Sequence, residues 1–181
     1  MISGAGPLPW FMPAVVICLV VSLAASGRVA RALGVPWVVA CVMLLSFGII
    51  ISATLTPLRW ALDVSLTGER SCDLSRIGLA PLADYLSRSE TDAGGNVLLF
   101  IPLGFAIGMV PRSRRKVAVI VAAILLPFAI ETIQLLAPAL DRSCESADVI
   151  DNLLGLAIGL GAGAVVGRLA PGVLRRRGGP G

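Results

Sequence analysis

Five long apolar stretches follow one another along the chain and are separated by polar connections. A helix that crosses a membrane needs about 20 largely apolar residues, because each residue adds only about 1.5 Å to its length. The stretches that approach or meet this requirement are 10–30, 35–58, 95–111, 117–139 and 148–168. The pattern therefore predicts an all-α fold, a polytopic transmembrane bundle of about five helices.

The composition supports a membrane protein. Hydrophobic residues make up 56% of the 181 residues and charged residues only 14%, whereas a soluble domain carries about 25% charged residues. We expect three parts: an N-terminal transmembrane helix with its cytoplasmic turn at 1–34, a membrane domain at 35–170 with an extracytoplasmic loop at 59–93, and a basic cytoplasmic tail at 171–181.

The basic residues indicate how the helices cross the membrane. Three clusters without acidic residues fall on one side of the predicted bundle: Arg28 with Arg31, the run 112–116, and Arg168 with the run 175–177. Cytoplasmic connections carry the excess of Lys and Arg, so we expect the N-terminus outside and the C-terminus in the cytoplasm. The first stretch has no basic residue before it, which is the wrong charge order for a signal peptide. Because the charges adjoin apolar runs, they predict contact with membrane lipids and not with nucleic acid.

Two cysteines lie in the connections that this topology places outside, Cys72 in the long loop and Cys144 between the fourth and fifth helices. In an oxidising compartment they could form a disulfide that ties the long loop to that hairpin. Two unpaired thiols remain the alternative, because spacing alone does not show that the Cα atoms come within reach. The segment "IGLAPLADYL" of the same loop is expected to lie on the membrane surface or to cover the bundle.

The chain contains no histidine, which excludes the Ser/His/Asp and Cys/His catalytic arrangements. It also lacks a Walker-type or Gly-x-Ser-x-Gly loop. Any chemistry must therefore use carboxylates, amides and arginine, and we expect neither a metal nor a cofactor.

Polar side chains recur at one depth on three of the predicted helices. Glu131 lies about two-thirds of the way along the fourth helix from its cytoplasmic end, and Gln134 follows one turn farther out. Asn96 opens the third helix, and Asp148 and Asn152 share one face at the outer end of the fifth. A charge inside a span costs at least about 2.5 kcal/mol and usually faces the bundle interior. We therefore predict a polar cleft in the outer leaflet.

Two more charged residues adjoin this cluster. Arg142 is the only cation close to it in sequence, so we expect Arg142 to line the cleft and to meet anionic groups there. Asp151 lies on an adjoining face of the fifth helix, which predicts a position nearer the lipid or the loop.

Prolines and glycines predict how the helices pack around the cleft. Pro102 and Gly104 weaken the third helix, and Pro127 is expected to kink the fourth. Overlapping Gly-x-x-x-Gly steps that begin at Gly155 and Gly159 let another helix approach the fifth closely.

These same residues resemble the motifs of the VanZ-like family. The stretch "NVLLFIPLGF" is similar to the family's Asn before a Phe-x-Pro-x-Gly helix, "IETIQLL" to its Glu-x-x-Gln, and "DRSCESADVIDNLLGLAIG" to its Arg-containing loop followed by Asp and Asn-x-x-Gly. The resemblance covers about residues 50–165. By position, the motif residues are Asn96, Phe100, Pro102, Gly104, Glu131, Gln134, Arg142, Asp148, Asn152 and Gly155.

The family is named after a membrane protein associated with resistance to the glycopeptide antibiotic teicoplanin, and its biochemical activity is not established. The resemblance thus implies a protein of the bacterial cell envelope with a link to antibiotic resistance, but no reaction. Many members have further aspartates where this chain has Glu145 and Ala147. A dense acidic or metal-binding cluster is therefore not expected in this loop.

Three functions are compatible with the cluster. The cleft could bind an amphiphile such as a lipid, a lipid-linked cell-wall precursor or a lipoglycopeptide. It could belong to a membrane-embedded enzyme, with Glu131 as general base and Asp148 holding a metal or a partner group. Or Glu131 could couple protons in a small carrier, which would require a homo-oligomer because inverted repeats are absent. The alternative to all three is that the polar groups only join the helices by hydrogen bonds. We favour amphiphile binding, since no nucleophile motif is recognisable.

Overall fold

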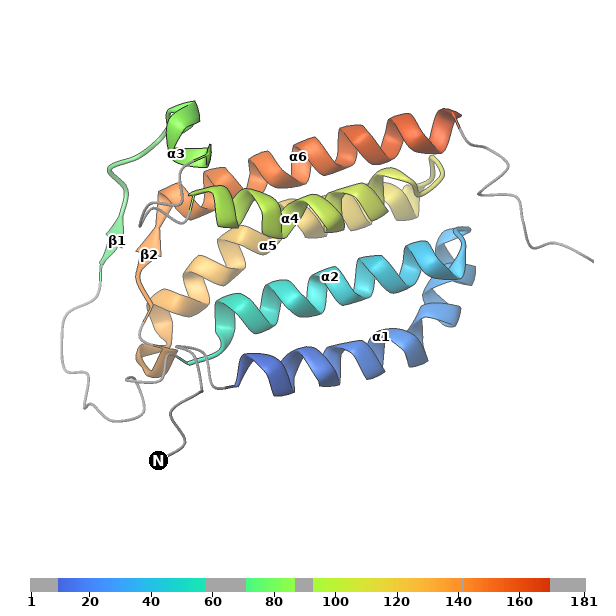
Figure 1. Ribbon diagram of the computed structural model, residues 1–181, viewed down its shortest axis with the longest axis horizontal. Coiled ribbons are helices and arrows are strands. Elements are labelled where there is room, and N and C mark those ends of the chain that lie inside the picture. The colour runs from blue at the N-terminus through green and yellow to red at the C-terminus, as the bar shows by residue number, and fades with distance from the viewer. Residues whose placement is uncertain (1–9, 58–70, 87–92, 141, 170–181) are drawn as a thin grey trace, which may run out of the picture.

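Five long helices lie side by side and form a bundle (Figure 1). The computed structural model describes residues 10–57, 71–86, 93–140 and 142–169. The long helices are α1 (Phe11–Leu33), α2 (Trp37–Leu55), α4 (Ala93–Gly108), α5 (Arg114–Leu136) and α6 (Ser146–Leu169). Four short elements gather at one end of the bundle: strand β1 (Cys72–Asp73), helix α3 (Leu82–Leu86), the 3-10 helix η2 (Pro138–Leu140) and strand β2 (Cys144–Glu145).

The all-α bundle predicted from the apolar stretches is confirmed. Among the described residues, four helices, α1, α2, α5 and α6, are long and apolar enough to cross a membrane. The third predicted span is a helix at the expected place, but α4 has only 16 residues, which gives a length of about 24 Å. Of the predicted loop 59–93, the structure describes 71–86, where "IGLAPLADYL" contributes α3. The predicted tail 171–181 lies outside the described residues.

Helices α4 and α6 run parallel and touch along their backbones. A methyl group added at Gly155, Gly159 or Gly163 of α6 would collide with the carbonyl oxygen of Val97, Ile101 or Phe105 of α4, respectively. Each contact is four residues after the previous one on both helices, so a single glycine-lined face continues through three turns. Without a hydrophobic driving force between helices in lipid, this close approach maximises van der Waals contact.

At the other end of the bundle, basic side chains donate hydrogen bonds to backbone carbonyls at or just beyond helix ends. Helix α1 ends at Gly34, whose φ of 67° is the left-handed conformation that glycine adopts without strain. Arg115 donates a hydrogen bond to the carbonyl of Ala32. The ammonium of Lys116 donates to the carbonyls of Gly108 and Val110, at 2.8 Å each. The carbonyls of Ala32 and Gly108 are terminal carbonyls of α1 and α4 that have no partner within their own helix, and Val110 lies two residues after α4. We call this end, with Arg28, Arg31, Arg112, Arg114, Arg115, Lys116 and Arg168, the basic end.

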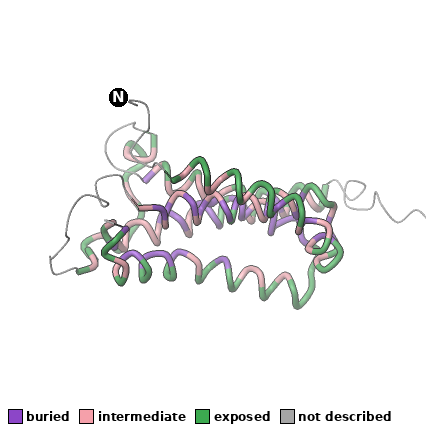
Figure 2. Tube along the Cα trace, turned by 90° about the horizontal axis from the view of Figure 1, so that it is seen from below, coloured by how far each residue is buried: buried purple, intermediate pink, exposed green. Residues whose placement is uncertain are grey.

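Buried positions lie on the faces that the helices turn toward one another, and exposed positions lie on the outer faces (Figure 2). The largest fully buried apolar side chains come from four helices: Ile50 of α2, Phe100 and Ile107 of α4, Ile130 of α5 and Leu156 of α6. The outer faces carry many exposed large hydrophobic side chains, as on α1, where only 11% of the most apolar window is buried. Apolar side chains thus cover the outer faces of the helices as well as the core, and such a surface suits a lipid environment.

The glycine-lined face generates a test with a matched control. Gly159→Ala places a methyl group against the backbone of Ile101, Gly104 and Phe105, whereas Gly161→Ala meets no atom within 4 Å. We expect Gly159→Ala to destabilise the protein by about 1 to 3 kcal/mol through overpacking. Gly161→Ala should stabilise it by about 0.5 to 1 kcal/mol, because alanine favours the helix more than glycine does.

The measurement is the midpoint of thermal unfolding of both variants in the same detergent. Equal midpoints for the two alanine variants would show that the α4–α6 contact does not support the fold.

Candidate functional site

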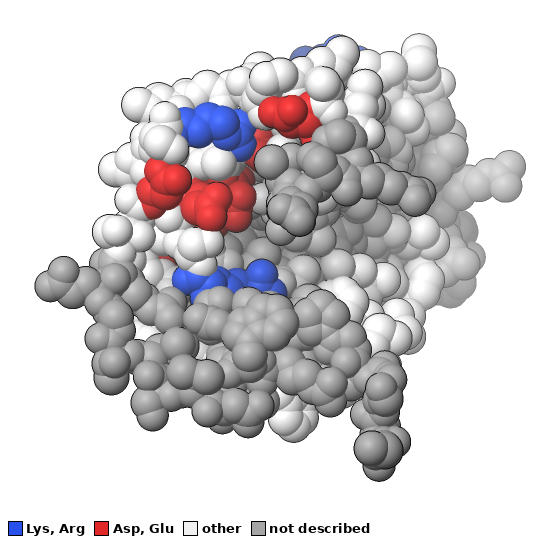
Figure 3. All heavy atoms as spheres, turned by 60° about the vertical axis from the view of Figure 1, so that its left-hand side comes forward, with Lys and Arg blue, Asp and Glu red and all other residues white. Residues whose placement is uncertain are grey.

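Hydrogen-bonded polar side chains from several described elements meet at the end of the bundle that bears β1 and β2, which we call the disulfide end. Here Cys72 and Cys144 form a disulfide with their Cα atoms 4.6 Å apart. Every acidic residue that the structure describes lies in this half of the molecule. Figure 3 looks onto this end and shows acidic and basic side chains side by side on it. The N-termini of α4 and α6 also lie here, so the positive ends of two helix dipoles favour carboxylates nearby.

The described part of the long loop is fastened to the start of α6. Strands β1 and β2 pair in parallel, with Cys72 opposite Cys144 and Asp73 opposite Glu145. Next to this pair, the hydroxyl of Ser146 donates to the carbonyl of Arg76 at 2.6 Å. The disulfide and these hydrogen bonds hold the loop over α6.

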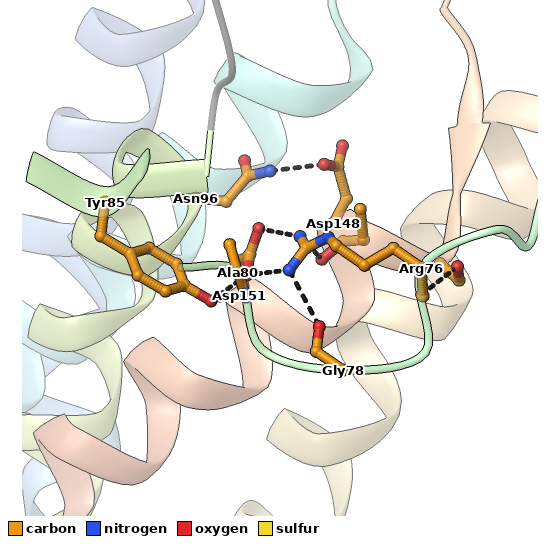
Figure 4. A network of polar contacts seen from close by, with 9 residues as sticks. Arg76, Gly78, Ala80, Tyr85, Asn96, Asp148 and Asp151 are labelled. Atoms are coloured by element: carbon orange, nitrogen blue, oxygen red, sulfur yellow. Dashed lines mark hydrogen bonds and ion pairs between the residues drawn. The ribbon is translucent and has the colours of Figure 1, made fainter. Parts of the chain in front are cut away.

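A buried ion pair reinforces this attachment (Figure 4). Asp151 of α6 is only 1% exposed. The guanidinium of Arg76 holds both of its carboxylate oxygens, with Nη1 3.2 Å from Oδ1 and Nη2 paired with Oδ2. The hydroxyl of Tyr85 in α3 donates to Oδ1 at 2.8 Å and in turn accepts from the amide of Ala80 at 3.0 Å. The hydrogen bond to Asp151 raises the pKa of the Arg76 guanidinium above its ordinary value.

This network decides between the two positions predicted for Asp151, nearer the lipid or nearer the loop: the carboxylate lies beneath the loop. The carboxylate points into the structure because the loop folds back and covers it with Arg76 and Tyr85. The sequence pattern assigns neither residue a role in the site. One signal was available: a carboxylate inside an apolar helix requires a cation, and the loop holds several arginines. The pattern of the chain does not reveal which arginine returns to α6.

Two of the predicted cleft residues form a direct pair beside this network. The side-chain amide of Asn96, near the start of α4, donates to Oδ1 of Asp148 in the first turn of α6 at 2.7 Å. The parallel packing of α4 and α6 puts both N-terminal turns at the same level, which makes this bond possible.

Two others lie instead at the end of α2. The amide of Gln134 donates to the carbonyl of Thr54 at 3.0 Å, and the guanidinium of Arg142 donates to the carbonyl of Ala53 at 2.7 Å. These are C-terminal carbonyls of α2 that lack an intrahelical partner, so Gln134 and Arg142 cap that helix. The carbonyl of Ala53 is thus one partner of Arg142, and the expected contact with anionic groups stays a prediction. Asn152 is buried with 1% exposure in the core.

Glu131, one of the six predicted cleft residues, lines a cavity of about 450 Å³ between α5, α6 and the described loop. Glu131 is 5% exposed, and its Oε2 accepts a hydrogen bond of 2.8 Å from the backbone N–H of Glu145. Most of the remaining wall is apolar and includes Ile77, Phe128 and Leu153. Ile77 is 88% exposed and Phe128 is 48% exposed, so apolar groups continue from the cavity onto the exposed surface.

The fold and this site define an integral membrane protein whose helices carry a polar cluster at one end. The model of the VanZ/LLP1 family matches residues 38–167. The chain therefore belongs to the VanZ/LLP1 family, and the matched region contains the glycine-lined helix pair, the disulfide and Glu131. No curated protein and no solved structure matches the chain significantly.

The buried ion pair gives a prediction about stability. Arg76→Met keeps an unbranched apolar stem but leaves the Asp151 carboxylate, 1% exposed, without its cation. We expect a loss of about 3 to 5 kcal/mol in the free energy of unfolding, the usual cost of an uncompensated buried charge. The double variant Arg76→Met/Asp151→Asn also removes that charge and should regain a large part of the loss.

Thermal unfolding in detergent, with wild type and the single variant Asp151→Asn alongside, measures both effects. A double variant no more stable than Arg76→Met would contradict the account, because the buried charge would then not be the source of the loss.

Proposed function

We propose that the protein binds an amphiphile in the cavity between α5, α6 and the loop that the disulfide holds. The main support for this proposal is the composition of that cavity, which has a mostly apolar wall and one buried carboxylate, that of Glu131. Ligand sites typically combine an apolar lining with a few fixed polar groups. An acyl or polyprenyl chain would lie along Phe128 and Leu153, and the polar part of the ligand would reach Glu131.

Family membership suggests a membrane protein linked to glycopeptide resistance. A membrane lipid, a lipid-linked cell-wall precursor and a lipoglycopeptide are all amphiphiles that a cavity of this kind would suit. We propose that the protein influences glycopeptide sensitivity through binding of such a molecule in the bacterial cell envelope.

Binding of cell-envelope molecules requires that the cavity face the outside of the cell. Disulfides persist in oxidising compartments, and basic residues concentrate on the cytoplasmic side. Both rules favour the same orientation, with the disulfide end outside and the basic end in the cytoplasm. The N-terminus would then be outside and the C-terminus inside.

Single cysteines test this orientation. Leu79→Cys is exposed at the disulfide end, and Pro111→Cys is exposed at the basic end without altering its charge. In spheroplasts, we expect a membrane-impermeant maleimide to label Leu79→Cys, and to label Pro111→Cys only after lysis. Wild type supplies the background from Cys18 and Cys41, which are not in a disulfide. The reverse labelling pattern would place the cavity on the cytoplasmic side and refute the proposal for envelope ligands.

Filling the cavity tests binding itself. Thr132 lines the cavity and is exposed, whereas the next residue, Ile133, is 42% exposed and is not part of its wall. We expect Thr132→Trp to displace amphiphiles that co-purify with the protein, because the indole occupies the cavity, and Ile133→Trp to leave them bound.

Native mass spectrometry of both variants, extracted from their own membrane, counts the bound molecules. Identical profiles for wild type and both tryptophan variants would show that the cavity holds no amphiphile. Glu131→Gln should still bind amphiphiles, because the apolar wall is unchanged, whereas base catalysis or proton coupling would be lost. The amide keeps the shape of the side chain and one acceptor oxygen, but it neither serves as a base nor carries a proton.

A further inference from the structure

The polar atoms of the cavity wall are almost all hydrogen-bond acceptors. Two hydroxyl groups line the cavity, and both donate elsewhere: Thr132 to the carbonyl of Phe128 at 2.8 Å, and Ser146 to the carbonyl of Arg76 at 2.6 Å. With their single protons used, these hydroxyls have only lone pairs to offer a ligand. The other polar side chains of the wall are the carboxylates of Glu131 and Glu145.

The two carboxylates retain acceptor capacity. Oε2 of Glu131 accepts from the amide of Glu145, and among the described residues its Oε1 accepts no hydrogen bond. Oε1 of Glu145 accepts from the hydroxyl of Ser143 at 2.7 Å. Glu131 lines the cavity, and its Oε1 is not among the fully buried polar atoms that lack a partner, so this oxygen is accessible to a ligand's donor.

No arginine or lysine is part of the cavity wall within the described residues. The two cations nearest in sequence are held elsewhere, Arg76 by the carboxylate of Asp151 and Arg142 by the carbonyl of Ala53. A phosphate or carboxylate headgroup would therefore meet carboxylates without a compensating cation. A ligand that supplies hydrogen-bond donors and positive charge would fit.

We propose, building on the proposed function, that the cavity selects amphiphiles that carry a protonated amine. The ammonium donates to Glu131 and Glu145, and the apolar chain lies along Phe128 and Leu153. Charge-assisted hydrogen bonds of this kind are about twice as strong as neutral ones. The shared chemistry is a primary ammonium on an acyl chain, and the source is either a bilayer lipid such as phosphatidylethanolamine or a single-chain amine that reaches the protein from solution.

Binding of matched probes tests the selectivity. Dodecylammonium, dodecyl phosphate and dodecanol have the same chain and differ in the headgroup. In native mass spectrometry of the purified full chain, we expect dodecylammonium to bind about tenfold or more tightly than the other two, as expected for one charge-assisted hydrogen bond. Glu131→Gln and Glu145→Gln should each remove this preference. Asp73→Asn removes an exposed carboxylate from the same end outside the cavity wall and should preserve it.

The outcomes separate the two proposals. If all three probes bind equally and Thr132→Trp blocks them all, the amine preference is refuted while amphiphile binding stands. If Thr132→Trp changes no binding, both are refuted. Should Glu131→Gln fail to fold, Glu145→Gln, which alters a half-buried residue, still decides the matter. Added phosphatidylethanolamine that binds and is displaced by dodecylammonium indicates a bilayer ligand, and binding of dodecylammonium alone indicates a soluble amine.

Discussion

The backbone contact between α4 and α6 is the constraint on which the rest of the structure depends. Glycines at 155, 159 and 163 let the carbonyls of α4 approach so closely that any side chain at those positions would collide. The contact fixes the two helices in parallel and in register, and it brings their N-terminal turns to one level. Two positive helix ends at the disulfide end in turn favour the carboxylates of Asp148 and Asp151 there. The positions of the polar residues at this end therefore depend on the close backbone packing of α4 against α6.

A second constraint explains how most of the polar residues are used. The last carbonyls of a helix have no partner within that helix, so water or a neighbouring side chain must supply a donor. Lys116 and Arg115 do so at the basic end, and Gln134 and Arg142 do so at the end of α2. A polar side chain in an apolar helix thus often serves the backbone of a neighbour. Glu131 is different, because its Oε1 accepts no hydrogen bond from the described residues and the side chain lines a cavity.

The loop that follows α2 completes this cavity. The disulfide joins it to β2, and Arg76 and Tyr85 fasten it to Asp151. Some anchoring residues also line the cavity, as Cys72, Cys144 and Ser146 do, whereas Arg76 anchors the loop without being part of the wall. The attachment of the loop therefore fixes one wall of the cavity.

The sequence by itself determined the all-α class, the position of each long helix and the glycine-lined face, because these follow from local length, hydropathy and periodicity. The sequence also identified Glu131 as a charged residue inside an apolar span, where a charge is costly without polar partners. Only the tertiary structure decided which polar residues meet. Asn96 reaches Asp148, but Gln134 and Arg142 turn to α2, and Asp151 is buried beneath a loop residue 75 positions away. Spacing places a side chain on one face of its own helix, whereas its partner depends on how distant segments pack, and that information is not local.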